Sequence, residues 1–287
     1  MDGSAPPGDP ARWLADLAGR ARVHHTPGGG GAMVWHDWGD GVPLVLLHGG
    51  HGSWNHWCRT IEPLVAAGFR VLAADLPGLG DSDDPGPPYT AEGLAAIVAH
   101  GIERIVPGAA FHLAGFSFGA VIGAVVVEHL DGRVLSFNMV GAAGFGPRPR
   151  ERGSLVRIHP GMEADELRAA ARNNMEWLMI ADPALVDELA VHIQITNSLR
   201  ARTVSRPLSN TTRLLDALGG LLAPVNAIWG SRDRTLAGGG LDQRIALLRE
   251  VRPDTAVEVL DGIGHWTQYE AAADYARLLV TMSGGAR

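Results

Sequence analysis

Apolar runs that end in glycine alternate along the chain with segments of helical periodicity. Residues 41–52, 69–82 and 111–119 each begin with an apolar run and end in a stretch rich in glycine or proline. Continuous apolar runs are typical of buried parallel strands, because both faces of such strands are covered. Residues 54–67 and 90–106 carry apolar positions at helical spacing. The alternation predicts an α/β fold with a mostly parallel, eight-stranded sheet covered by helices.

The two ends of the chain extend this pattern. The first ten residues carry acids and prolines and are expected to be frayed. A short helix is expected at 11–20, and four glycines at 28–31 predict a tight turn between two strands. The other expected elements are a helix at 118–130, a strand near 134–141, a strand within 223–233, a helix at 241–251, a strand at 256–260 and a helix at 268–281.

The sheet pattern is interrupted after the sixth expected strand. Residues 144–153 combine glycine, proline and arginine, which indicates an exit from the sheet. From about residue 154 to residue 212 the sequence shows helical periodicity and no strand pattern. We therefore predict an α/β core domain formed by 1–146 and 213–287, with a helical lid at 147–212.

A Gly-Phe-Ser-Phe-Gly sequence occupies residues 115–119, between an apolar strand and an apolar helix. A strand that turns into a helix within one residue strains that residue, Ser117, and leaves little room for side chains two positions away. Gly115 and Gly119 meet this requirement. The pattern predicts a nucleophile elbow that presents the Ser117 hydroxyl at the edge of the sheet. For so short a motif, a Gly-rich turn with a solvated serine is the alternative.

A serine nucleophile needs a general base, and the base needs a carboxylate that orients it. Asp233 and His265 each follow an apolar strand, so both are expected at the carboxyl edge of the sheet, where Ser117 lies. The order Ser, Asp, His is the one that accompanies a nucleophile elbow. The alternatives are a loop salt bridge for Asp233, with Arg232 or Arg234, and a merely polar loop role for His265.

Two backbone N–H groups are needed to bind the oxygen that becomes negative when a carbonyl is attacked. The N–H of Phe118, directly after the nucleophile, is one candidate. Gly50, in the turn formed by His48, Gly49 and Gly50, is the other. We expect His48 to brace this turn by hydrogen bonding rather than to react.

These motifs together resemble the α/β-hydrolase superfamily, in its form with a helical lid. Five of them occur in order, at residues 48–50, 75–82, 115–119, 229–233 and 264–266. The resemblance implies the hydrolase fold and structural roles for Asp75 and Ser82. Dehalogenases and epoxide hydrolases carry Asp at the nucleophile position, so Ser117 argues against those branches.

The tail Gly-His-Trp-Thr-Gln-Tyr-Glu resembles that of meta-cleavage product hydrolases, which cut a carbon–carbon bond next to a ketone. In them a Trp follows the catalytic histidine, as Trp266 does here. The chain departs from that group at three places. Phe116 and His56 stand where the group has Asn, and His192 or Ile193 stands where it has an arginine for the substrate carboxylate.

These departures favour an apolar ester or lactone, hydrolysed through an acyl-enzyme. The alternatives are carbon–carbon bond hydrolysis of ring-fission products and ligand binding without turnover. The rings of Phe116, Phe118, Trp54, Trp57 and Trp266 are expected to hold such a substrate. The substrate pocket is predicted to include Phe116, His56, Trp54, Trp266, Met175, Met179 and His192.

Composition and charge limit the classes of molecule that the protein is expected to bind. The formal net charge of −7 argues against nucleic-acid binding, and no apolar run approaches the roughly 18 residues of a membrane span. Cys58 is the only cysteine, so an internal disulfide is excluded. Despite 12 histidines, no metal-binding spacing and no nucleotide motif is present, so we predict neither metal nor cofactor. A soluble cytoplasmic protein with a small-molecule substrate is expected, and a homodimer is left open.

The nucleophile assignment gives the first testable prediction. Replacement of Ser117 by Ala removes the attacking oxygen, so turnover is expected to fall by on the order of 10³-fold or more. Labelling by a fluorophosphonate probe should disappear in the same variant. A Ser117→Ala protein with near-normal activity contradicts the assignment.

Overall fold

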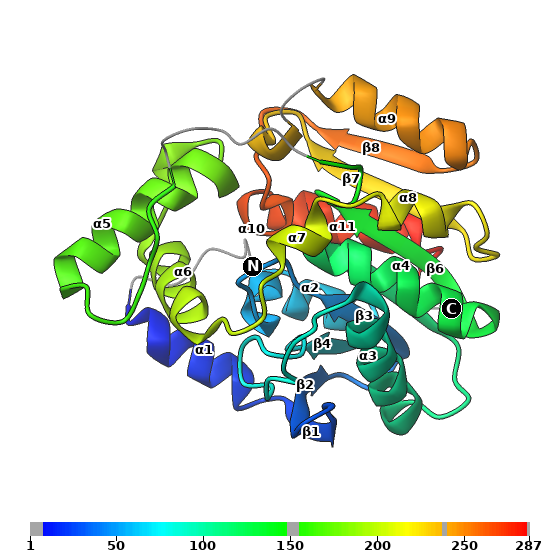
Figure 1. The fold of residues 1–287 in the computed structure, drawn as a ribbon, viewed down its shortest axis with the longest axis horizontal. Helices are drawn as coiled ribbons and strands as arrows, with labels where there is room; N and C mark the ends of the chain where they lie inside the picture. The colour runs from blue at the N-terminus through cyan, green and yellow to red at the C-terminus, as the bar shows by residue number, and fades with distance from the viewer. Residues whose placement is uncertain (1–7, 148–154, 237–239, 286–287) are drawn as a thin grey trace.

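The computed structural model describes residues 8–147, 155–236 and 240–285 (Figure 1). Its strands are β1 Arg22–Pro27, β2 Ala32–Trp38, β3 Val42–Leu47, β4 Phe69–Ala74, β5 Phe111–Phe116, β6 Val134–Val140, β7 Val225–Gly230 and β8 Ala256–Leu260. They form one sheet in the order β1-β2-β4-β3-β5-β6-β7-β8. β2 is antiparallel to both of its neighbours, and every pair from β4 to β8 is parallel. The predicted α/β fold is confirmed.

Helices cover both faces of the sheet (Figure 1). The apolar cluster on one face includes side chains from α3 Ala91–Ile105, α4 Phe118–Leu130, α8 Arg213–Leu218 and α9 Gly240–Val251. The cluster on the other face includes side chains from α1 Pro10–Ala18, α2 Ile61–Ala66 and α11 Ala272–Met282. Successive residues of β3 serve the two faces in turn, since Val45 joins the first cluster and Leu46 the second. Both faces are apolar, which explains the continuous apolar runs.

The chain between β6 and β7 is helical. It contains α5 Ala164–Asn174, a π-helical turn η3 Met175–Met179, a short turn η4 Pro183–Leu185, α6 Glu188–Arg200 and α7 Arg206–Ser209. Figure 1 places α5 and α6 at one side of the molecule, next to α1. Within the described residues this segment contains no strand, only an isolated bridge between Pro160 and Met162.

Some predicted boundaries lie outside the described part of the chain. Residues 1–7 of the expected frayed terminus belong there, as do residues 148–154, which include most of the expected exit at 144–153. The division into a core and a lid at 147–212 therefore stays a prediction.

Two predicted helices are each divided in the structure. The helix expected at 54–67 is a 3₁₀ turn, η1 Trp54–Trp57, followed by α2. The Thr60 hydroxyl donates to the Trp57 carbonyl at 2.9 Å and ends the first turn. The helix expected at 268–281 is α10 Thr267–Glu270 followed by α11, because Ala271 leaves the helical region with φ −125° and ψ 50°.

The packing of α4 against β3 predicts which glycine cannot be replaced. A Cβ atom on Gly119 would lie 2.2 Å from the Leu47 carbonyl oxygen, which is backbone and cannot rotate away. Gly119→Ala is expected to lower the free energy of unfolding by about 1–3 kcal/mol in urea denaturation. Gly132→Ala is the matched control, because its Cβ would meet nothing within 4 Å. Equal stability of the two variants contradicts this packing.

Candidate active site

Ser117 lies at the junction between β5 and α4. Its backbone has φ 51° and ψ −109°, a strained conformation for a residue with a side chain. Two hydrogen bonds hold the turn, from Ser117 N–H to the Val140 carbonyl at 2.9 Å and from Ala143 N–H to the Ser117 carbonyl at 3.2 Å. Among residues 111–127, Ser117 alone is not buried. The turn therefore exposes one side chain and hides its neighbours.

Asp233 and His265 form a buried pair at the ends of β7 and β8. Asp233 Oδ2 lies 2.7 Å from His265 Nδ1, and Thr235 N–H donates to Asp233 Oδ1 at 2.8 Å. Burial by itself opposes ionisation of Asp233. The attraction and hydrogen bond of His265, together with Thr235, outweigh burial and lower the pKa of Asp233. An ionised Asp233 keeps the proton on Nδ1, so Nε2 is left to accept a proton.

The imidazole of His265 lies between the end of β6 and the elbow. A Cβ atom on Gly141, directly after β6, would lie 2.9 Å from His265 Nδ1, so only glycine fits there. The ring of Phe116 has its centroid 4.9 Å from that of His265. Because Phe116 directly precedes Ser117, the serine and the histidine lie at the same edge of the sheet. Sequence reasoning missed Gly141 and Thr235, since a glycine after a strand and a threonine in a loop are common.

The turn at residues 48–50 packs against the elbow. A Cβ atom on Gly49 would lie 3.4 Å from the Ser117 Cβ, and one on Gly50 would lie 4.0 Å from the Phe118 Cβ. Within the described residues, the backbone N–H groups of Gly50 and Phe118 donate to no protein acceptor. The oxyanion role of both groups stays a prediction.

His48 braces this turn from inside the protein. Its Nε2 accepts a hydrogen bond from Leu76 N–H at 2.9 Å, and its Nδ1 therefore donates to the Gly49 carbonyl at 2.7 Å. Burial lowers the pKa of His48 to about 4, so the ring is neutral at pH 7. The contacts agree with the expected bracing role.

The chain matches the model of the alpha/beta hydrolase fold family over residues 42–201. It belongs to this family. A 2-hydroxy-6-oxononadienedioate/2-hydroxy-6-oxononatrienedioate hydrolase of Cupriavidus pinatubonensis is 27% identical over 281 residues, covering 92% of this chain and 91% of the relative. The dihydrolipoyllysine-residue acetyltransferase component of the acetoin cleaving system of Cupriavidus necator is 30% identical over 286 residues. The match covers 95% of this chain and 69% of the relative.

A solved structure supports the same fold. The meta-cleavage product hydrolase of Pseudomonas fluorescens IP01, solved as a mutant complexed with acetates, superposes with a TM-score of 0.71. It is 21% identical, and the match covers 91% of this chain and 97% of that one. This chain is accordingly an α/β-hydrolase with an eight-stranded sheet. No helix in its described residues is long and apolar enough to cross a membrane.

Aromatic rings lie close to His265, the candidate base of this hydrolase. The His56 ring lies between Phe116, at 5.6 Å, and Trp266, at 5.1 Å. Trp266 donates its Nε1–H to the His56 carbonyl at 2.9 Å and stacks on Tyr269 at 4.1 Å. Burial lowers the pKa of His56 well below its usual value. Three predicted pocket residues thus come together next to His265, with Trp266 also acting as a brace.

Other predicted pocket residues have different surroundings in the hydrolase. Trp54 packs on His36 and Trp38 of β2, at 4.9 and 5.5 Å between centroids, and its place in the pocket stays a prediction. Among the lid residues, Met175 is buried in η3, while Met179 in η3 and His192 in α6 are half-buried. Their contact with substrate also stays a prediction.

The expectation for the Phe118 side chain was wrong. The rings of Phe116 and Phe118 join the apolar clusters on opposite faces of the sheet. The reversal of the chain at Ser117 turns the two flanking side chains to opposite sides, so Phe118 contributes packing and only its backbone N–H can serve the site.

Asp75 has the structural role that the resemblance implied. Its carboxylate accepts backbone N–H groups of Trp54 at 2.7 Å and Asp81 at 2.8 Å, and the Ser82 hydroxyl donates to its carbonyl at 2.6 Å. Burial raises the pKa of Asp75 to about 7. This carboxyl group connects two loops, and its hydrogen bonds do not involve Asp233 or His265.

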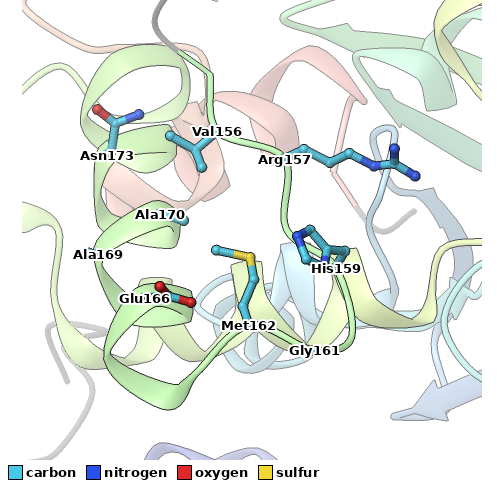
Figure 2. A pocket seen from close by; sticks show the side chains of 9 residues that line it. All are labelled: Val156, Arg157, His159, Gly161, Met162, Glu166, Ala169, Ala170 and Asn173. Carbon is cyan, nitrogen blue, oxygen red and sulfur yellow. The ribbon is translucent and has the colours of Figure 1, made fainter.

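A separate hollow lies in the helical segment between β6 and β7 (Figure 2). Its volume is about 560 Å³. It lies between α5 and the extended chain before α5, from which Arg157 and His159 project. Its lining residues are Val156, Arg157, His159, Gly161, Met162, Glu166, Ala169, Ala170 and Asn173. None of the candidate catalytic residues lines this hollow, and we assign it no part in the reaction. Within the described residues, no group of three or more potential ligands could hold a metal ion.

The neutral His48 predicts a pH dependence of stability. An unfolded histidine binds a proton below about pH 6.5, whereas folded His48 binds one only near pH 4. Between these values the unfolded state holds more protons, so stability falls as the pH is lowered, by up to about 1.4 kcal/mol per pH unit. His48→Gln removes this contribution, because Gln offers the same acceptor and donor without titrating.

Urea denaturation at pH 7 and pH 5 measures the effect. The loss of stability between the two pH values is expected to be smaller in His48→Gln than in the wild type. His159→Gln, at an exposed position, serves as the control. An unchanged loss in His48→Gln contradicts a buried neutral imidazole.

Proposed function

We propose that this hydrolase cleaves a carbon–carbon bond next to a ketone in a small ring-fission product, with Ser117, His265 and Asp233 as its catalytic residues. The observation that carries the proposal is similarity to the Cupriavidus pinatubonensis hydrolase over about nine tenths of both chains. The loop that carries His265 also supports the proposal. Trp266 directly follows the histidine, as in the meta-cleavage group, and donates a hydrogen bond to the His56 carbonyl.

The geometry suggests how the steps proceed. His265, held by Asp233, first moves a proton from the dienol oxygen of the substrate to carbon and so forms the ketone. Its Nε2 then takes the proton of Ser117, whose oxygen attacks the carbon of the other ketone, next to the bond that is cut. The N–H groups of Gly50 and Phe118 bind the resulting oxyanion. The carbon–carbon bond breaks, and the departing carbon takes up the proton that His265 received from Ser117. His265, neutral again, then activates the water that releases the acyl group from Ser117.

A second candidate function is hydrolysis of an apolar ester or lactone. Phe116 places an apolar ring 4.9 Å from His265, at a position where the meta-cleavage group carries Asn. Ile193, at one of the two positions that align with the group's carboxylate-binding arginine, is 1% exposed and apolar. These residues favour a substrate that carries no carboxylate. The chemistry of Ser117 is the same for both candidates.

A comparison of rates separates the two functions. The purified protein is given p-nitrophenyl acetate, butyrate and octanoate, and separately a 2-hydroxy-6-oxo-dienoate, with consumption followed by absorbance. We expect kcat/KM for the dienoate to exceed that of the best ester by at least about tenfold, roughly 1.4 kcal/mol of transition-state stabilisation. Ser117→Ala is the control for both reactions. Preference for an ester overturns the first candidate and supports the second.

A further inference from the structure

The carboxylate of Glu270 lies between the His265 loop and the segment that follows η3. It accepts a hydrogen bond from Gly264 N–H at 2.7 Å, directly before the catalytic histidine. It also accepts hydrogen bonds from Ala181 N–H at 3.0 Å and Asp182 N–H at 2.9 Å. One charged group therefore holds backbone N–H groups from two segments that are more than eighty residues apart. Charge-assisted hydrogen bonds of this kind are about twice as strong as neutral ones.

The same two segments touch directly. Trp266 N–H donates to the Met179 carbonyl at 2.7 Å. A Cβ atom on Gly264 would lie 2.7 Å from Ala181 N and 2.9 Å from the Met179 carbonyl oxygen, so the backbones meet with no room for a side chain. The residues on both sides of His265 are thus fixed to residues 179–182.

Other contacts attach the helical segment to the core without involving this loop. Asn197 of α6 and Asn55 of η1 exchange side-chain hydrogen bonds at 2.8 and 3.1 Å. Since these contacts are separate from Gly264, attachment of the helices does not by itself require Glu270.

We propose that Glu270 is a positioning residue for His265. Its carboxylate fixes Gly264 against residues 179–182 and so sets the place of the imidazole relative to Ser117. The proposal rests on the proposed role of Ser117 and His265, but not on the identity of the substrate. Displacement of a catalytic group by about 1 Å can cost on the order of 100-fold in rate. Loss of the hydrogen bonds of Glu270 is therefore expected to slow the reaction.

Glu270→Gln tests the proposal, because the Gln side chain has nearly the same shape as that of Glu. The Gln amide has one oxygen and an NH₂ group, so at least one of the three backbone N–H groups then faces another donor. The readout is the second-order rate constant for inactivation by a small alkyl fluorophosphonate, which reports on Ser117 and its base. We expect this constant to fall by about 10- to 100-fold. With p-nitrophenyl acetate, kcat should fall by a similar factor while KM changes less than about threefold.

Asn197→Ala is the matched control, because it weakens attachment of α6 while leaving the Gly264 contact intact. Its inactivation constant is expected to stay within about threefold of the wild type. Thermal unfolding of both variants verifies that each is folded. A folded Glu270→Gln protein that reacts at the wild-type rate overturns the proposal, as does an equal loss in Asn197→Ala. Wild-type protein that fails to react refutes the proposed serine mechanism instead.

Discussion

The turn from β5 into α4 is the constraint on which the rest of the site depends. The chain changes from strand to helix at one residue, so Gly119 must pass against the backbone of Leu47 at a distance that admits no Cβ. This contact places the beginning of α4 in the middle of the molecule, where the first ten residues of the helix are all buried. The only side chain that the turn leaves accessible is that of Ser117. Strain at this residue is compensated by packing around it.

His265 depends on parts of the chain that are far apart in sequence. Asp233 holds its Nδ1 from the end of β7, and Gly141 gives it space at the end of β6. The residues on either side of it are bound to the segment after α5, through Glu270 and the Met179 carbonyl. The proposed role of His265 as general base requires a well-defined position, and three separate elements contact this residue or its neighbours. The loop that carries His265 is therefore joined directly to residues 179–182.

The polarity around Asp233 and His265 bears on the proposed substrate. Phe116, His56 and Trp266 form a buried group of rings, and burial keeps the pKa of His56 low and its ring neutral. A neutral imidazole offers hydrogen bonding without adding a charge next to the protonated form of His265. Under either proposed reaction, the rings around His265 favour a neutral carbonyl group over an anion at the point that Ser117 attacks.

Local pattern determined the sheet, the elbow and the order of the candidate residues Ser117, Asp233 and His265. Apolar periodicity and the two glycines around Ser117 are properties of neighbouring residues, so the sequence carries them directly. The breaks at Thr60 and Ala271 were missed because the helical periodicity runs through both positions without interruption. The opposite orientations of Phe116 and Phe118, the contact of Gly141 with His265 and the three hydrogen bonds of Glu270 were decided by the tertiary structure. Each depends on a distance between residues remote in the chain, and such distances exist only after the sheet has formed.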